Sequence, residues 1–269
     1  MEQQLNGFLR ELDPRPSDPV AYRVVTDAAD AEITAWVGRR IAIEFTGERA
    51  CIHCGRRVKK LFNQGYCYPC FTTLAECDLC IVKPHECHFH KGTCRDEGFA
   101  AEHCMIPHYV YLAYSSGVKV GLTRKGRELK RWMDQGAVAA VLLAEVPTRK
   151  IAGELEMEIA KHLPDKTDWR RMLRAWGEPD VDLAAVREEV ASRLPAVWQR
   201  HLLAPAQVRR FHYPRGAAEE PNLTALSLDK QPRVEGTVTA IKGQYLLLDC
   251  GVLNVKRHAG YHVQISLES

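Results

Sequence analysis

The side chains of this sequence whose types and spacing most clearly indicate chemistry are its clustered cysteines. "CIHC" and "CYPC" place Cys51, Cys54, Cys67 and Cys70 in the pattern C-x2-C-x12-C-x2-C. Zinc prefers four soft ligands in a tetrahedron, and each C-x2-C turn presents two thiolates to one metal. Gly55 follows the second cysteine directly, where a tight knuckle needs an unusual φ angle. We therefore predict a structural zinc site, because a redox dithiol would need only one pair, at the start of a helix.

A second cysteine set follows with less regular spacing. It comprises Cys77, Cys80, Cys87 and Cys94, with two, six and six residues between them. We expect this set to hold a second zinc ion. Cys104 or a nearby histidine could replace one of these four cysteines as a ligand. The nearby histidines are His85, His88, His90 and His103. An iron–sulfur cluster is a further alternative for the whole set, because it also takes four thiolates.

The composition indicates a folded, soluble protein. The chain has 269 residues, 46% of them hydrophobic, which is enough for a substantial core in one to three domains. Its start, "MEQQLNGFLRELDPRP", lacks the apolar core of a signal peptide, and no stretch approaches the roughly 18 apolar residues of a membrane span. We expect a cytoplasmic protein without membrane contact, in which paired cysteines bind metal rather than form disulfides. The lone Cys250, in "LLLDCG", is expected to be a buried apolar side chain.

A compact segment of strands and helices is predicted directly after the cysteines. "HYVYLAYSSGVKVGLT", at residues 108–123, is typical of a tight β-hairpin of β-branched and aromatic residues. Hydrophobic periodicity, with Gly136 as a helix stop and Thr148 as an N-cap, extends this hairpin into the order ββαβα. The expected elements are strands at 109–114, 118–122 and 138–146 and helices at about 125–135 and 148–163.

This ββαβα segment resembles the GIY-YIG nuclease superfamily over about residues 108–170. The resemblance rests on "YVYLA" in the first strand, "KVGLT" in the second, an arginine-rich helix and "AGELEMEIAKHL". The whole chain also resembles an uncharacterised bacterial zinc-binding family, because a cysteine segment precedes "VYLAYSSGVKVGLT" and "RWMDQGA". The second resemblance implies no activity.

The resemblance to GIY-YIG nucleases implies a set of catalytic residues. The tyrosine of the first motif corresponds to Tyr111, and the glycine of the second motif to Gly121. Lys119 stands where the superfamily has a second tyrosine, a candidate base. The arginine that steadies the scissile phosphate corresponds to Arg131, with Arg127 as the competing choice. A lysine binds phosphate well but is a poor base unless burial lowers its pKa.

Glu156 corresponds to the glutamate that holds the catalytic metal in that superfamily. Periodicity supports this choice independently, because Ala152 and Ala160 flank Glu156 on a stripe next to the apolar one. The apolar stripe itself is formed by Ile151, Leu155, Ile159 and Leu163. Glu154 and Glu158 fall farther round the helix, where solvated ion pairs are expected. Glu156 would hold Mg²⁺ or Mn²⁺ as a Lewis acid, and the motif tyrosine would position or deprotonate the attacking water.

Basic residues gather in two stretches although the net charge is only +3. These are "GRRVKKL" at 55–61 and "KVGLTRKGRELKR" at 119–131. Local basic patches matter more to nucleic-acid binding than the total charge. The predicted contacts with nucleic acid are Lys119, Arg124, Lys125, Arg127, Lys130 and Arg131. RNA is slightly favoured over DNA, because zinc-ribbon-like knuckles and small β modules are common in RNA-handling proteins.

Five segments are expected along the chain. They are a β-rich N-terminal part at 1–50, a cysteine-rich metal-binding segment at 51–107, the GIY-YIG-like domain at 108–174, a helical connector at 175–232 that contains "DLAAVREEVASRL", and a β-meander at 233–269. A terminal meander cannot easily bury its own face, so we expect the two chain ends to form one small β module. The predicted fold class is α+β, with a zinc-ribbon-like segment and a GIY-YIG-like ββαβα domain.

These features predict a nucleic-acid-binding metalloprotein. The resemblance extends this to a divalent-metal-dependent, structure-specific endonuclease, and the sequence leaves open whether cleavage accompanies binding. One alternative is an iron–sulfur-dependent enzyme that modifies nucleic acid such as tRNA, with its cluster on the second cysteine set. The other is a non-catalytic protein-interaction scaffold, whose basic patches would be solvated surface.

Overall fold

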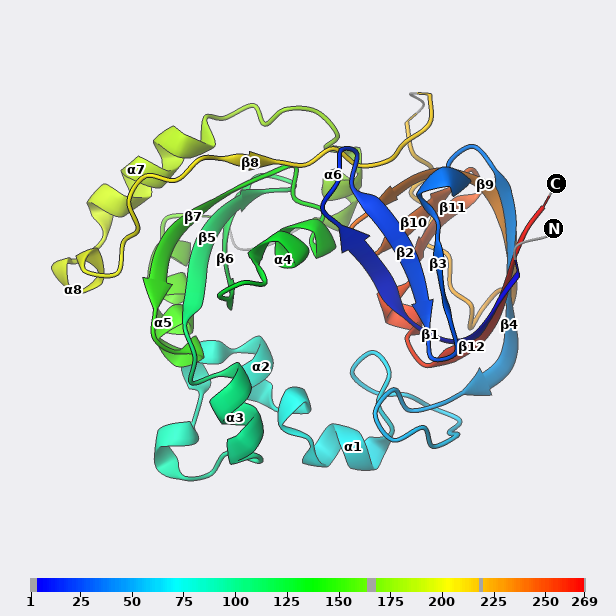
Figure 1. Cartoon of the computed structure of the whole chain (residues 1–269), viewed down its shortest axis with the longest axis horizontal. Coiled ribbons are helices and arrows are strands. Elements are labelled where there is room, and N and C mark those ends of the chain that lie inside the picture. The colour runs from blue at the N-terminus through cyan, green and yellow to red at the C-terminus, as the bar shows by residue number, and fades with distance from the viewer. Residues whose placement is uncertain (1–3, 164–167, 218–219, 269) are drawn as a thin grey trace. The chain divides into compact units, whose positions relative to one another are not determined.

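The computed structural model describes residues 4–163, 168–217 and 220–268, and it shows a mixed α+β protein with two compact units. The terminal unit combines Met1–Phe71 with His212–Ser269, and the central unit is Thr72–Phe211. Each unit contains its own antiparallel sheet (Figure 1). The first cysteine set therefore belongs to the terminal unit and the second set to the central unit. No helix among the described residues is long and apolar enough to cross a membrane.

An eight-stranded sheet forms the terminal unit, with the order β11-β10-β9-β4-β12-β1-β2-β3. β12 lies between β1 and β4, so strands from both chain ends are hydrogen-bonded neighbours. The pairing of the chain ends agrees with the expectation from the sequence. The strands are β1 (Gln4–Arg15), β2 (Ala21–Thr26), β3 (Asp30–Glu32), β4 (Arg40–Arg49), β9 (Arg233–Lys242), β10 (Tyr245–Leu248), β11 (Gly251–Asn254) and β12 (Tyr261–Leu267).

This sheet is larger than the small module expected, mainly because β1 is a full strand. It ends in "LDPR" directly before Pro16, a stretch typical of a turn, yet Leu5, Leu9 and Leu12 along the strand are buried. This single strand pairs with β12 through Gln4–Phe8 and with β2 through Leu9–Arg15, and the pairing with β2 has a register shift after Leu9. The prediction for Cys250 is wrong, since its side chain is exposed. It lies in the turn between β10 and β11, beyond the buried part of the strand.

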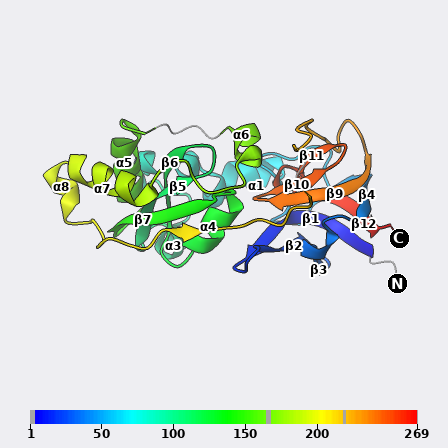
Figure 2. The same cartoon turned by 90° about the horizontal axis from the view of Figure 1, so that it is seen from above.

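A four-stranded sheet with the order β6-β5-β7-β8 forms the middle of the central unit. β5 (His108–Tyr114) and β6 (Val118–Arg124) form the predicted hairpin, and β7 (Ala139–Val146) pairs with the other edge of β5. α4 (Glu128–Asp134) and α5 (Arg149–Ala160) follow β6 and β7, so the ββαβα order agrees with the prediction. The short β8 (Arg209–Arg210) pairs with β7. Figure 2 shows these strands from above.

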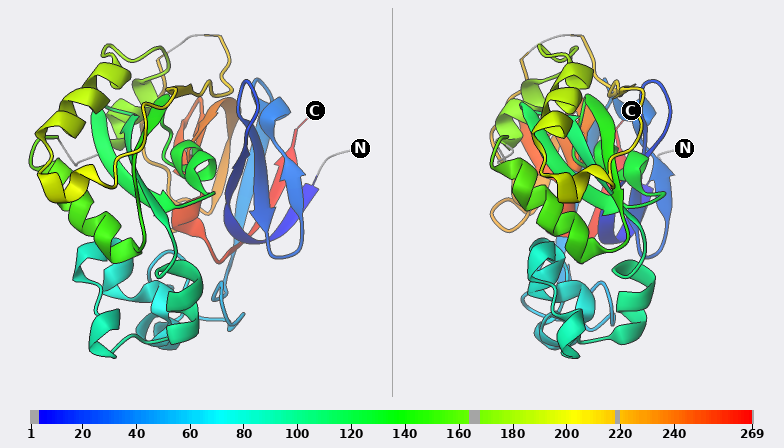
Figure 3. Two further views of the ribbon diagram at one scale, coloured as in Figure 1. Left: turned by 60° about the vertical axis from the view of Figure 1, so that its left-hand side comes forward. Right: turned by 90° about the vertical axis from the view of Figure 1, so that its left-hand side faces the viewer.

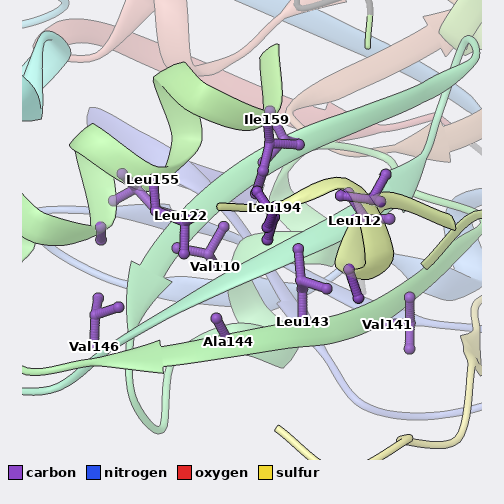
Figure 4. Packing of buried hydrophobic residues seen from close by; sticks show 14 of the residues in the cluster. Val110, Leu112, Leu122, Val141, Leu143, Ala144, Val146, Leu155, Ile159 and Leu194 are labelled. Atoms are coloured by element: carbon purple, nitrogen blue, oxygen red, sulfur yellow. The ribbon is translucent and has the colours of Figure 1, made fainter. Parts of the chain in front are cut away.

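The apolar core of the central unit lies between this sheet and two helices. Leu155 and Ile159 of α5 are fully buried in one cluster with Val110 and Leu122 of the hairpin (Figure 4), as the predicted apolar stripe requires. α7 (Leu183–Arg193) adds further apolar side chains to the same cluster, and the sequence also predicts this helix. The unit also contains α6 (Trp169–Arg174) and α8 (Ala196–Gln199), which follow α5 in the chain.

Residues 72–107 form short helical turns (Figure 3), and the turn at Pro84–Glu86 packs on α5. A glycine permits this close approach, because a Cβ on Gly153 would lie 2.5 Å from the backbone nitrogen of His85. The second cysteine set is thereby fixed against the helix that carries Glu156. The turns are α2 (Leu79–Val82), α3 (Glu97–His103) and 3₁₀ segments at Ala75–Cys77, Pro84–Glu86 and Phe89–Lys91; α1 (Tyr68–Thr73) precedes them.

Candidate metal centres and catalytic cluster

The first cysteine set converges in the terminal unit. The sulfur atoms of Cys51, Cys54, Cys67 and Cys70 all lie within 4.8 Å of one another, and those of Cys54 and Cys67 are 3.7 Å apart. Four ligands at about 2.3 Å from a tetrahedral zinc ion would have sulfurs separated by about 3.8 Å. The four cysteines could therefore hold a metal ion such as zinc.

Local backbone structure brings the two halves of this centre together. The first pair follows β4, where the N–H of Ala50 donates to the carbonyl of Gly260 at 2.8 Å. Gly55 has φ +71° and its N–H donates to the carbonyl of Cys51, which is the knuckle that the sequence predicts. The second pair lies at the start of α1. Both pairs are thus presented by short, hydrogen-bonded turns.

The electrostatics of this centre favour a bound cation. Burial by itself raises the pKa of Cys51, but the N–H groups of Cys54, Cys67 and His53 donate to its sulfur and hold the pKa at about 6. Burial and the neighbouring sulfurs raise the pKa of Cys70 instead. Four sulfurs this close cannot all become thiolates unless a positive charge lies among them.

The second cysteine set surrounds a small cavity in the central unit. Cys80, Cys87 and Cys94 line it as predicted, and Cys104 lines it too, but Cys77 is not among the lining residues. The cavity measures about 20 Å³. The structure therefore brings three of the four predicted cysteines together with the cysteine that the sequence left as an alternative.

One histidine, His88, also borders this cavity, and Asp78, Cys80 and His88 form a compact group that could hold a metal ion. Asp78 is already engaged, because its carboxylate lies 2.7 Å from Nε of Arg95 and caps α2 by accepting from the N–H of Cys80. His88 Nδ1 lies 2.8 Å from Oγ1 of Thr93. The Thr93 contact engages Nδ1 of His88 and leaves its Nε2 facing Asp78 Oδ1 at 3.5 Å.

Tyr111 is fully buried at the centre of the hairpin. Its hydroxyl donates to Oε1 of Gln135 at 2.9 Å, and its ring meets Trp132 edge-on with centroids 5.7 Å apart. It pairs with Gly121, where a Cβ would lie 2.6 Å from the Tyr111 hydroxyl, so only glycine fits opposite the ring. Burial raises the pKa of Tyr111. The phenol therefore stays protonated at neutral pH and is suited to positioning, not to proton abstraction.

Lys119 and Arg131 add two positive charges to this group. Lys119 is buried on β6, and burial, followed by repulsion from Arg131, lowers its pKa to about 8. Arg131 is exposed on α4, and its guanidinium interacts with the phenol of Tyr111. Lys119 can act as a base only if burial lowers its pKa, and in the structure Lys119 is buried.

Glu156 lies half-buried on α5, between the small residues Ala152 and Ala160. Its carboxylate interacts electrostatically with Tyr111 and with Arg149. The residues that the resemblance selects thus lie on four different elements, β5, β6, α4 and α5. Electrostatic interactions link them into one group.

The predicted nucleic-acid contacts differ in their availability. Lys125 Nζ lies 2.8 Å from Oε1 of Glu145, and Lys130 Nζ lies 3.5 Å from Oδ1 of Asp134. The charges of these two lysines are partly neutralised by their acidic neighbours. Arg124, at the end of β6, interacts with Arg127, the N-cap of α4: burial and then the charge of Arg127 lower the pKa of Arg124.

Arg149 is a residue that the sequence does not single out. It begins α5, where a cation is unfavourable to the helix dipole. Its Nη2 donates to the carbonyl of Ile81 at 2.6 Å, and its Nε is buried with no hydrogen-bond partner within the described part of the chain. Its charge interacts with Cys104, Arg131, Cys80 and Glu156. Its unfavourable helix position is the one sequence signal that could have identified it.

A family model described as "Protein of unknown function (DUF2797)" matches residues 38–263. The match spans most of the chain and includes all ten cysteines, but its description assigns no activity. No curated protein and no solved structure matches the chain.

Proposed function

The chain belongs to the DUF2797 family of proteins of unknown function, and we propose that it binds nucleic acid and cleaves a phosphodiester bond with the help of a divalent metal ion. The observation that carries this proposal is the electrostatic coupling of Tyr111, Lys119, Arg131 and Glu156 across four elements. The ββαβα order and the close fit of Tyr111 over Gly121 support a GIY-YIG-like domain.

The proposed division of roles follows from burial and charge. Arg131 is exposed, so its guanidinium can contact a phosphate and stabilise the charge that develops on it. Lys119 is buried with a lowered pKa, so its neutral amine can accept a proton from the attacking water. Tyr111 stays protonated and donates to Gln135, so its oxygen can accept a hydrogen bond from Arg131 or from the attacking water and position it.

Glu156 is the proposed ligand of the divalent ion. A half-buried carboxylate between small side chains fits a hard cation such as Mg²⁺ or Mn²⁺, and its negative charge would favour binding. When bound, this ion would polarise the phosphoryl oxygens as a Lewis acid.

The metal knuckle of the terminal unit supplies a second proposed contact surface. The stretch "GRRVKKL" lies between the two cysteine pairs, and Lys60 lies over the ring of Phe62 at 4.9 Å. Basic side chains next to aromatic rings suit single-stranded or looped nucleic acid, which supports the preference for RNA. The first experiment is to sequence nucleic acid that copurifies with the native protein.

Removing the two central cations should weaken nucleic-acid binding. We expect Arg131→Ala with Lys119→Ala to lower affinity and to flatten the salt dependence by about 0.7–0.9 for each phosphate that is no longer neutralised. Fluorescence anisotropy with an RNA hairpin and a DNA hairpin of the same sequence, at several salt concentrations, measures both effects. The charge-matched control is Arg193→Ala with Lys161→Ala, two ion-paired residues that are not among the predicted nucleic-acid contacts. Equal slopes for the two double variants would contradict the assignment.

The pH dependence of cleavage should follow the protonation state of the Lys119 amine. Its amine is protonated below about pH 8 and neutral above it, so we expect cleavage to rise with pH and to level off above pH 8. Binding should change in the opposite direction, because the cation disappears over the same range. Lys119→Arg should keep binding but remove the step near pH 8, since arginine stays protonated. A step that persists in this variant would exclude Lys119 as the base.

A further inference from the structure

Four cysteines surround the cavity of the central unit, and they are not the four that the spacing selects. Cys80, Cys87, Cys94 and Cys104 line it, whereas Cys77 does not. We propose that these four residues hold an iron–sulfur cluster. This inference does not depend on nuclease activity, because it concerns the metal content alone.

The size of the site distinguishes it from the first cysteine set. All four sulfurs of the first set lie within 4.8 Å of one another, but among the described residues the one group this compact at the second cavity is Asp78, Cys80 and His88. The cysteines of the second set are therefore spread more widely. A single zinc ion draws its thiolates together, whereas a cluster places iron and sulfide ions between them.

A buried cation balances the charge that such a cluster carries. Four thiolates with a cluster have a net negative charge, which is costly to bury without a partner. The guanidinium of Arg149 interacts electrostatically with Cys104 and Cys80, and its Nη2 donates to the carbonyl of Ile81, next to Cys80. Its buried Nε has no hydrogen-bond partner among the described residues. A buried N–H donor near the thiolates is typical of residues that hydrogen-bond to the ligands of a metal centre and orient them.

The cluster would also tie the cysteine segment to the helix that follows β7. Cys104 is the C-cap of α3, and its carbonyl accepts a hydrogen bond from the N–H of Arg149 at 2.8 Å. Arg149 is the first residue of α5, on which Glu156 lies. Loss of the cluster is therefore expected to loosen residues 72–107 from α5.

The test is metal and sulfide analysis of the full chain. The protein is expressed with added iron, purified without oxygen and treated with ferrous iron, sulfide and a thiol reductant. We expect iron and acid-labile sulfide in equal amounts, visible thiolate-to-iron absorption, and one zinc ion from the first cysteine set. Two zinc ions without sulfide after this treatment would overturn the proposal.

Serine variants test which cysteines bind the cluster. Cys104→Ser should lose the iron, the sulfide and the visible absorption but keep one zinc ion, whereas Cys77→Ser should keep all of them. A variant of Cys77 that loses the cluster, or a variant of Cys104 that keeps it, would overturn the ligand assignment. The retained zinc shows that the terminal unit is folded in each variant.

A second measurement covers the case in which Cys104→Ser does not fold. In the native protein, Cys80 and Cys94 are only partly buried, so their thiols can be alkylated when no cluster is present. We expect both to be protected from alkylation in the iron-loaded protein and modified after the cluster is removed by oxidation and chelation, as measured by mass spectrometry. Equal modification before and after removal would contradict the proposal.

Discussion

Replacement of Cys54 by serine is expected to release the metal ion of the first cysteine set and to unfold the loop that carries it. Among residues 51–71, only Cys51, Gly65 and Cys67 are buried, so the loop has no apolar core. Its order therefore depends on the metal. Structural zinc contributes roughly 10–16 kcal/mol of binding free energy in zinc-finger peptides at neutral pH, and much of this is folding free energy.

Two measurements check this expectation. Elemental analysis should show one fewer metal ion per chain, and trypsin should cut faster at the exposed basic residues Arg56, Arg57, Lys59 and Lys60. The matched control is Cys250→Ser, which makes the same chemical change at an exposed cysteine of the same unit, outside both sets. Unchanged metal content and proteolysis in Cys54→Ser would show that the first set does not hold a structural metal.

The first centre and the hairpin could be predicted because their signals are local. The C-x2-C pairs and Gly55 specify a knuckle within a few residues, and the apolar stripe of α5 specifies which face is buried. Thr148 likewise caps α5 through its own side chain. Each of these features depends on residues within one short segment of the chain.

The features that the sequence does not reveal depend on long-range packing. Cys104 joins the second cavity because α3 returns to α2 and α5, and no spacing rule records that return. β1 is a strand because β12 and β2 pair with it, although Pro14 within it and Pro16 directly after it favour a turn. The burial of Lys119, which lowers its pKa, follows from the packing around β6 and not from its neighbours in the chain.

Replacement of Glu156 by glutamine is expected to abolish cleavage while leaving nucleic-acid binding intact. The amide keeps the size of the side chain but loses the negative charge that would bind the divalent ion. A bound Lewis acid contributes several kcal/mol of transition-state stabilisation, so we expect a loss of about 100-fold or more in rate. Binding should be unchanged or slightly tighter, because the variant removes a negative charge near Arg149 and Arg131.

The matched control for this variant is Glu154→Gln on the same helix. Glu154 forms an ion pair with Lys150, and Glu158 pairs with Lys161, so these two carboxylates have the surface role that the sequence predicts. Glu154→Gln should therefore change neither the cleavage rate nor its dependence on Mg²⁺ or Mn²⁺ concentration. Cleavage by Glu156→Gln at the native rate would refute the metal role of Glu156. Loss of cleavage in both variants would point instead to general damage of α5. The two glutamates lie about half a turn apart on the same helix, so only a metal-binding role specific to Glu156 would make the two variants differ.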